Sequence, residues 1–135
     1  MSKGTLTYAE VSAGVQATLA TYTQSLDSGR FDDVLATFIA DGVLEIPDFD
    51  LVAEGHDALR AYYVSTDGKG ALRHVVANSL VSEQQDGKVD VSSDLLVLRK
   101  GDTGWALLMV GTYRDTLRLD EGVWRFQRRT LSFSN

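Results

Sequence analysis

The second half of the chain consists of four strand-like apolar runs that follow one another directly, at residues 72–84, 88–99, 105–119 and 123–133. The short segments DGK, KGDTG and DEG separate these runs, and such turn sequences join antiparallel neighbours. Four consecutive strands without intervening helices argue against an alternating βαβ arrangement. This half of the chain therefore predicts an antiparallel sheet.

The first half predicts helices. Residues 7–10, TYAE, form a capping box with Thr7 as the N-cap, and Gly29 suits the end of the helix that follows. Between them, apolar residues recur at steps of three or four, which places them on one face of a helix. They are Tyr8, Val11, Val15, Leu19, Tyr22 and Leu26.

Two further helices and two short strands complete the expected elements. FDDVLATFIAD (31–41) predicts a short helix with Phe38 among its inward residues, and HDALRAYYVST (56–66) predicts a third helix. GVLEI and LVAEG predict short strands on either side of a turn at Pro47. We expect residues 1–135 to form a single α+β domain. A curved antiparallel sheet with three helices on one face would form a cone whose mouth is a pocket.

The composition argues against several classes of function. The chain has 13 lysines and arginines against 19 aspartates and glutamates, and its net charge of −6 opposes binding to nucleic-acid backbones. It has no cysteine, two histidines and no HExxH-type spacing, so no metal site is predicted. No apolar run approaches the ~20 residues that span a bilayer, and no signal-peptide pattern begins the chain. We expect a cytoplasmic protein with no membrane or nucleic-acid partner.

His74 is the first candidate for chemistry, because it stands inside the apolar run LRHVVANSLV (72–81). If this run is a strand, His74 shares a face with Val76, Asn78 and Leu80, and we expect that face to be the concave one. Histidine gains or loses a proton near neutral pH, so it can serve as an acid or a base. The same pattern also fits a core histidine with a satisfied hydrogen bond.

Asp27 is the second candidate, at the edge of the apolar stripe in the last turn of the first helix. The helix dipole disfavours a carboxylate at this end, and a nearby cation such as protonated His74 would offset that cost. An exposed Asp-Ser-Gly turn is the simple alternative. The other histidine, His56, begins the third helix and is interpreted as a surface residue or as a support to the site.

Two tyrosines are candidates for contacting a ligand. Tyr22 lies on the apolar stripe, and a buried tyrosine usually finds a partner for its hydroxyl. Tyr113, in GTYRD, is expected to share a strand face with the odd-numbered residues from Trp105 to Gly111, where the glycine either leaves room for a ligand or marks a kink. Both tyrosines also fit ordinary core positions.

The segments YTQSLDSGRFDDVLATFIADG, EGHDALRAYY, RHVVANSLV, GTYRD and DEGVWRFQRR follow an order that resembles the SnoaL-like branch of the nuclear transport factor 2-like superfamily. The resemblance covers nearly the whole chain and implies a cone-shaped α+β fold with a pocket. Members include scytalone dehydratase, hexachlorocyclohexane dehydrochlorinase, polyketide cyclases, ketosteroid isomerase and the β subunits of ring-hydroxylating dioxygenases. Fold alone therefore does not select a function.

The resemblance also implies roles for single residues. Asp27 and His74 resemble the aspartate and histidine of the dyad in the dehydratase and the dehydrochlorinase. Tyr22 resembles the helical tyrosine of ketosteroid isomerase, but Ile46 stands where the base of that enzyme is expected, which argues against its mechanism.

We therefore expect a cofactor-independent lyase or isomerase. Asp27 and His74 would remove a proton from a small hydrophobic molecule, which Tyr22, Asn78 and Tyr113 would bind. The alternatives are a non-catalytic ligand-binding or oxygenase β-subunit-like module and a polyketide-cyclase-like enzyme. The resemblance also implies a homodimer through the exposed face of the sheet, where apolar residues alternate.

Overall fold

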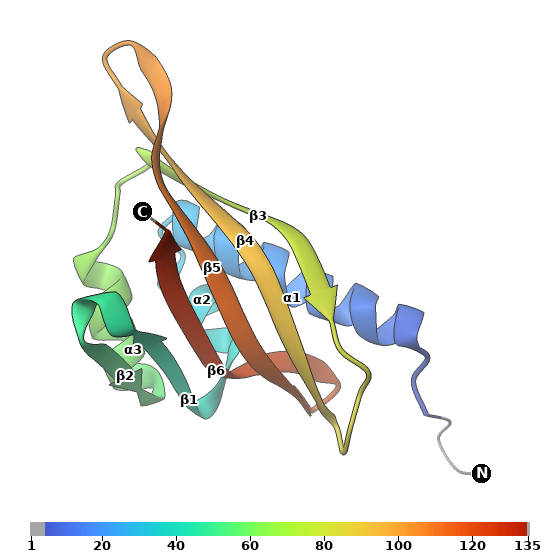
Figure 1. The fold of residues 1–135 in the computed structure, drawn as a ribbon. Helices are drawn as coiled ribbons and strands as arrows, with labels where there is room; N and C mark the ends of the chain where they lie inside the picture. Colours follow the sequence, from blue (N-terminus) through green and yellow to red (C-terminus); the bar gives the residue numbers. More distant parts are fainter. Residues whose placement is uncertain (1–4, 135) are drawn as a thin grey trace.

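A computed structural model describes residues 5–134, which form one six-stranded sheet with three helices on one side (Figure 1). The α+β fold class with a curved sheet is confirmed. In chain order the elements are α1 (Tyr8–Asp27), α2 (Phe31–Ala36), β1 (Phe38–Ile46), the 3₁₀ turn η1 (Pro47–Phe49), β2 (Leu51–Glu54), α3 (Gly55–Ser65), β3 (Leu72–Val81), β4 (Lys88–Gly101), β5 (Gly104–Asp120) and β6 (Val123–Ser134).

The strands lie in the order β2-β1-β6-β5-β4-β3. The long strands β3 to β6 pair antiparallel, as their short connections predict. The pairing of β1 with β6 is parallel, which the expectation of an antiparallel sheet did not include. Because α2 and β1 are joined by a single residue, Thr37, the first strand enters the sheet directly from the helix layer.

Helix α1 begins and ends where the sequence predicts. Thr7 and Glu10 form the capping box, and Gly29, with φ +70°, follows the helix in the left-handed conformation that favours glycine. The helix packs closely on β6 at Gly14, where a Cβ atom would lie 2.7 Å from the Trp124 ring. The predicted apolar stripe is buried except for its first residue, Tyr8, which is half exposed, and its last, Leu26, which is partly buried.

The helix expected over residues 31–41 is shorter, and this expectation was wrong for its second half. The helix ends at Ala36, and Phe38 begins strand β1. Phe38 pairs with Phe126, and the backbone N–H of Phe126 donates to the carbonyl of Thr37 at 2.7 Å. Pairing with the neighbouring strand therefore outweighs the local helical pattern of this segment.

An irregularity in β3 changes which side chains face the helices. Asn78 has φ +55°, and the pairing register with β4 shifts between Ala77 and Leu80. Asn78 therefore points to the outer face, where its side-chain amide donates to Asp94 at 2.8 Å, and Leu80 is 74% exposed. The prediction that Asn78 and Leu80 share the concave face with His74 was wrong, because strict alternation does not survive a bulge.

A second irregularity affects β5. The register with β4 shifts so that Met109 pairs with Val97 and Leu107 pairs with Leu98. The extra residue, Leu108, turns Leu107 and Trp105 to the outer face, whereas Met109 and Tyr113 stay on the helix side. The expected common face from Trp105 to Tyr113 was therefore wrong at its beginning.

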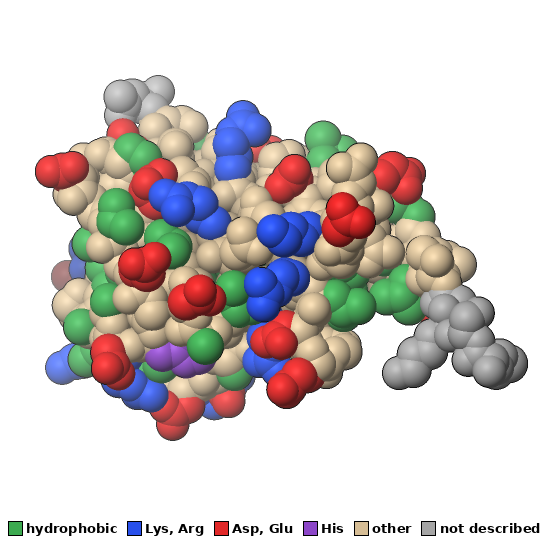
Figure 2. Space-filling view, turned by 90° about the horizontal axis from the view of Figure 1, so that it is seen from below, with side chains coloured by type: hydrophobic (Ala, Val, Ile, Leu, Met, Phe, Trp, Pro, Cys, Tyr) green, Lys and Arg blue, Asp and Glu red, His purple; other side chains and the backbone are tan. Residues whose placement is uncertain are grey.

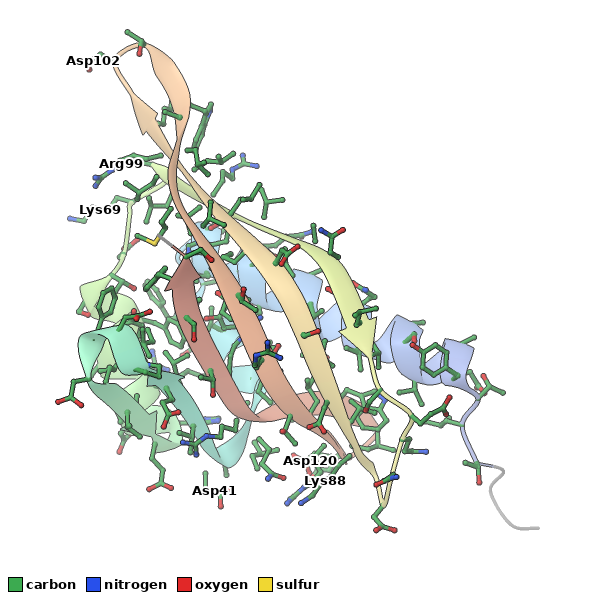
Figure 3. The ribbon with its side chains drawn as sticks, in the orientation of Figure 1. Asp41, Lys69, Lys88, Arg99, Asp102 and Asp120 are labelled. Carbon is green, nitrogen blue, oxygen red and sulfur yellow. The ribbon has the colours of Figure 1, made fainter. Side chains whose placement is uncertain are left out.

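The outer surface is mixed in character. Asp102 lies at the tip of the hairpin between β4 and β5, and Lys88 and Asp120 lie at the opposite end of the sheet (Figure 3). The face seen in Figure 2 carries interspersed acidic and basic side chains. Exposed apolar side chains occur on the outer face of the sheet, among them Val75 and Leu96. A homodimer through this face stays a prediction.

The conformation of Asn78 gives a test of the bulge. Asn78→Val places a β-branched side chain at a positive φ and removes the bond to Asp94, so we expect it to lower the free energy of unfolding by about 1–3 kcal/mol. Asn78→Gly is the matched control, because glycine accepts this φ, and its loss should be smaller. Urea denaturation measures both. Equal stability of the valine variant and the native protein would contradict the bulge.

Candidate functional site

A cavity of about 200 Å³ lies between the helix layer and the concave face of the sheet. Its wall is mostly apolar and comes from α1, α3 and five of the six strands, with Leu44, Leu95, Val97, Met109 and Leu131 among its residues. Phe49, which is 58% exposed, also lines it and packs against Phe133 with ring centroids 5.2 Å apart. The polar side chains in this wall are therefore the candidates for chemistry.

Asp27 and His74 meet in the wall of this cavity. Asp27 is the last residue of α1, and His74 is the third residue of β3. The Nδ1 atom of His74 lies 2.7 Å from Oδ1 of Asp27, and the backbone N–H of His74 donates to the same carboxylate at 3.0 and 3.2 Å. The side chains of His74 and Asp27 are only 16% and 13% exposed, respectively. The expected proximity of the two residues is present.

This contact fixes the chemistry of the imidazole. An ionised carboxylate only accepts hydrogen bonds, so Nδ1 of His74 carries the proton in its contact with Asp27. In a neutral ring the other nitrogen, Nε2, then has a free lone pair. The arrangement can therefore accept a proton at Nε2, and the carboxylate can stabilise the imidazolium that forms.

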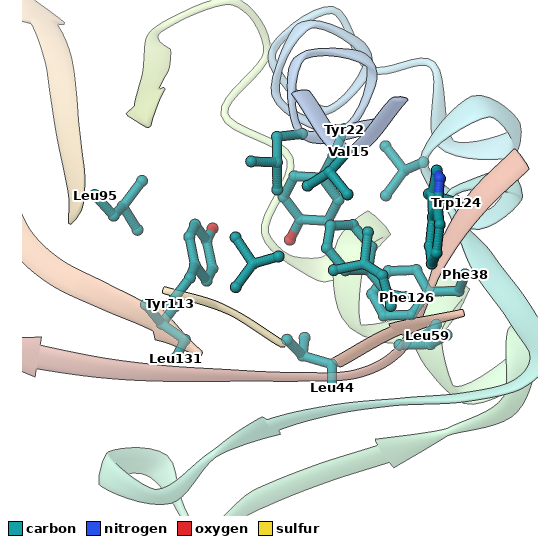
Figure 4. Close-up of a cluster of buried hydrophobic side chains, with 14 of the residues drawn as sticks. Val15, Tyr22, Phe38, Leu44, Leu59, Leu95, Tyr113, Trp124, Phe126 and Leu131 are labelled. Carbon is teal, nitrogen blue, oxygen red and sulfur yellow. The ribbon is translucent and has the colours of Figure 1, made fainter. Parts of the chain in front are cut away.

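A cluster of tyrosines lines another part of the cavity. Tyr22 of α1 and Tyr63 of α3 share a hydrogen bond between their hydroxyls at 2.7 Å, and the rings of Tyr22 and Tyr113 meet edge to face (Figure 4). Burial raises the pKa of all three hydroxyls above the usual value for tyrosine. They therefore stay neutral near pH 7 and can donate hydrogen bonds. Tyr63 was not among the residues predicted for the site, and it joins the cluster through its hydrogen bond to Tyr22.

A buried ion pair lies directly against these rings. Nε of Arg129 is 3.1 Å from Oδ1 of Asp115, and both side chains are fully buried. The Arg129 guanidinium carbon lies 3.3 Å from the ring centroid of Tyr113 and 4.2 Å from that of Tyr22. Within residues 5–134 no hydrogen bond of good geometry joins the pair, because the guanidinium lies against ring faces.

The sequence patterns did not predict that Asp115 and Arg129 would form a buried pair, and the cause is the register of β6. Asp115 alternates with Tyr113 and Leu117, so the pattern of β5 contained a signal for its burial. Arg129 gave no such signal. The register between β5 and β6 shifts at Gln127, and this bulge turns Arg129 to the same face as Phe126, three residues earlier. Strict alternation would have placed Arg129 outside.

The remaining candidates lie elsewhere. Nε2 of His56 is 3.2 Å from the carbonyl of Phe38, and His56 is not part of the cavity wall. Asn78 is also absent from that wall. Among residues 5–134, no group of three or more His, Asp and Glu side chains is placed to hold a metal ion. No helix in this part of the chain has the length and apolar character needed to cross a membrane.

Comparison with known proteins agrees with the fold. A sequence model of the SnoaL-like domain matches residues 7–130. The chain belongs to the SnoaL-like domain family. Comparison with curated proteins found no match.

Solved structures resemble this SnoaL-like protein over almost its full length. Aln2 from a Streptomyces species is 26% identical, with a TM-score of 0.86 over 96% of this chain and 94% of its own. A Nostoc punctiforme protein of unknown function with a cystatin-like fold is 23% identical, with a TM-score of 0.83 over 97% and 96%. A Novosphingobium aromaticivorans protein assigned as the β subunit of an aromatic-ring-hydroxylating dioxygenase is 18% identical, with a TM-score of 0.79 over 96% and 93%. The last two likenesses show the fold alone.

The buried pair gives a test by pH. Burial raises the pKa of Asp115 to about 6, although the Arg129 guanidinium opposes this shift. An unfolded aspartate releases its proton as pH rises past about 4, whereas the folded state holds the proton on Asp115 until about pH 6. The contribution of Asp115 to stability is therefore fully present at low pH and is lost as pH rises through this window, by about 1–3 kcal/mol.

Urea denaturation at pH 4 and pH 6.5 measures this effect. The control is the double variant Asp115→Leu/Arg129→Met, which removes both charges and with them this contribution. We expect the stability of the native protein to fall relative to the double variant between these two pH values. Parallel pH profiles would contradict the assignment.

Proposed function

We propose that this protein catalyses proton abstraction from a small, largely apolar carbonyl compound, leading to elimination or isomerisation without a cofactor. The observation that carries the proposal is the Asp27–His74 pair in the wall of an apolar cavity. A carboxylate that holds an imidazole in one tautomer, with the second nitrogen free, is the arrangement that a general base requires.

In the proposed reaction, Nε2 of His74 removes a proton from the carbon next to the carbonyl group. The C–H electron pair moves to the carbonyl oxygen, which becomes an enolate, while Asp27 stabilises the imidazolium. In an elimination from a β-hydroxy carbonyl compound, the enolate re-forms the carbonyl group and a C=C bond forms as the C–O bond to the β-hydroxyl breaks. The imidazolium gives its proton to the departing hydroxyl, so the products are an α,β-unsaturated carbonyl compound and water. In an isomerisation, the proton returns to another carbon. A base of this kind contributes ~10²–10⁴ in rate.

The tyrosine cluster supplies the second half of the proposed chemistry. Neutral hydroxyls of Tyr22 and Tyr113 would donate hydrogen bonds to the carbonyl oxygen as it gains charge. Donors held in a dry, preformed site stabilise such a charge more than water does. His74 and the two tyrosines are different residues of the wall, so the substrate would present its acidic C–H bond to His74 and its carbonyl oxygen to the tyrosines.

The size and lining of the cavity bear on the substrate class. A volume of about 200 Å³ is below the ~300–1,000 Å³ common for drug-sized ligands. We therefore propose a substrate of one or two rings, or an aliphatic compound of similar size. Because the wall is mostly apolar, the part of the substrate that contacts it would be uncharged.

Two alternatives lead to different results with variants. A polyketide-cyclase-like enzyme would use Asp27 itself as acid and base, so His74→Gln would retain most activity. A non-catalytic module, by analogy with the fold shared with the Novosphingobium protein, would show no exchange above the rate without protein. The accessible cavity favours a ligand-dependent function over a purely structural one.

The test is exchange of α-protons for deuterium, which reports proton abstraction even when the physiological substrate is unknown. Small apolar ketones such as 1-indanone, 2-tetralone and cyclohexenone are incubated in D₂O with the protein, and NMR follows the loss of the α-proton signal. We expect His74→Gln to lower the exchange rate by ~10²–10⁴, and Asp27→Asn to lower it as well.

His56→Gln is the matched control, since His56 is the other histidine and lies outside the cavity wall. It should exchange at the native rate. Native-rate exchange by His74→Gln, or a loss of equal size in His56→Gln, would rule out His74 as the base.

A further inference from the structure

The ion pair of Arg129 and Asp115 is an unusual group for the centre of an apolar core. Both side chains are fully buried, and neither lines the cavity. Removing two charges from water is costly, and apolar residues of similar volume often stabilise a protein as well as a buried ion pair or better. The two terminal guanidinium nitrogens, Nη1 and Nη2, also lack hydrogen-bond partners within residues 5–134. A cost of this kind in the centre of the core calls for an explanation beyond folding.

The position of the guanidinium suggests that explanation. Arg129 lies against the ring faces of Tyr113 and Tyr22, at 3.3 and 4.2 Å from their centroids, and both tyrosines line the cavity. A cation against an aromatic face is attracted by the electron density of the ring. It draws that density away from the hydroxyl, which becomes a stronger hydrogen-bond donor.

Two of the hydroxyls share a hydrogen bond, and the charge of Arg129 acts on all three tyrosines. Tyr22 and Tyr63 share a hydrogen bond at 2.7 Å, and Arg129 favours the ionised form of all three tyrosines while burial opposes it and keeps each pKa raised. The wall around them is otherwise mostly apolar, so an anion in this part of the cavity would have few other groups to stabilise it.

We propose that Arg129 is a positioning residue that makes the hydroxyl cluster of Tyr22, Tyr63 and Tyr113 a site for a negatively charged oxygen, that of a phenolate or an enolate. It acts through the tyrosine rings and does not touch the ligand. The carboxylate of Asp115 partly neutralises the positive charge of Arg129 and so limits the effect of Arg129 on the tyrosines. The role of this site in turnover rests on the proposed function, because the site would stabilise the negative charge of the enolate that His74 generates.

The inference can be tested by binding, without turnover. Isothermal titration calorimetry compares two ligands of similar shape, 4-nitrophenolate and the neutral 4-nitrotoluene, at a pH where the nitrophenol is ionised. All proteins carry His74→Gln, so an imidazolium cannot contribute to anion binding. The measured quantity is the ratio of the two affinities. A failure of the Asp27–His74 base would leave this ratio unaffected, so the two proposals can fail separately.

The double variant Arg129→Met/Asp115→Leu removes the pair and keeps apolar volume. We expect its preference for the phenolate to fall by about tenfold relative to the parent. Arg128→Met is the matched control, because Arg128 is a half-exposed neighbour that pairs with Glu45 on the outer face. It should leave the ratio unchanged. An unchanged ratio in the folded double variant, or an equal fall in the control, would overturn the proposal.

Asp115→Asn provides an independent measurement if the double variant does not fold, as judged by circular dichroism. This change leaves the cation without its counter-charge, so we expect the preference for the phenolate to increase. An unchanged or smaller preference in the folded Asp115→Asn protein would also overturn the proposal.

Discussion

The carboxylate of Asp27 connects the two layers of this protein at its candidate site. It accepts hydrogen bonds from the backbone N–H and the Nδ1 of His74, and so joins the end of α1 to the beginning of β3. A carboxylate at the C-terminal end of a helix is unfavourable, and one that is mostly removed from water is costly unless it is well paired. The contacts with His74 offset both costs. The geometry of the imidazole therefore depends on the same contact that joins the end of α1 to β3.

The interior of the cone combines this pair with a second polar group of side chains. Tyrosine hydroxyls line another part of the cavity, and a buried arginine lies against two of their rings. Most of the surrounding wall is apolar, so interactions among these groups are weakly screened. The charge pattern of the cavity is thus independent of the overall charge of −6, which is carried largely by the exposed surface.

Much of the fold follows from local signals in the sequence. The capping box at Thr7 and the turns between the long strands predict the boundaries of α1 and of β3 to β6 within a few residues. The proximity of Asp27 and His74 was expected from their positions and from the family resemblance. The element boundaries depend on side chains close in sequence or on a regular period, which a single sequence reveals, whereas Asp27 and His74 lie far apart in the chain and their pairing was expected mainly from the resemblance.

What the sequence did not reveal depends on strand register. A bulge adds one residue to a strand and exchanges the two faces beyond it. Asn78 belongs to a residue type that tolerates the positive φ of its bulge, but an asparagine in a strand does not by itself predict one, and Gln127 carries no such signal. The first bulge removes Asn78 from the cavity, and the second brings Arg129 into the core. The beginning of β1 at Phe38 was also missed, because its pairing with Phe126 is a contact between distant parts of the chain.

In the proposed mechanism, Asp27 holds His74 with its proton on Nδ1 and leaves Nε2 free to act as the base. ¹⁵N NMR of the imidazole distinguishes the two tautomers of the neutral ring directly. We expect a protonated Nδ1 and an unprotonated Nε2 for His74 in the native protein, and loss of this preference in Asp27→Ala. A ring protonated at Nε2 in the native protein would contradict it.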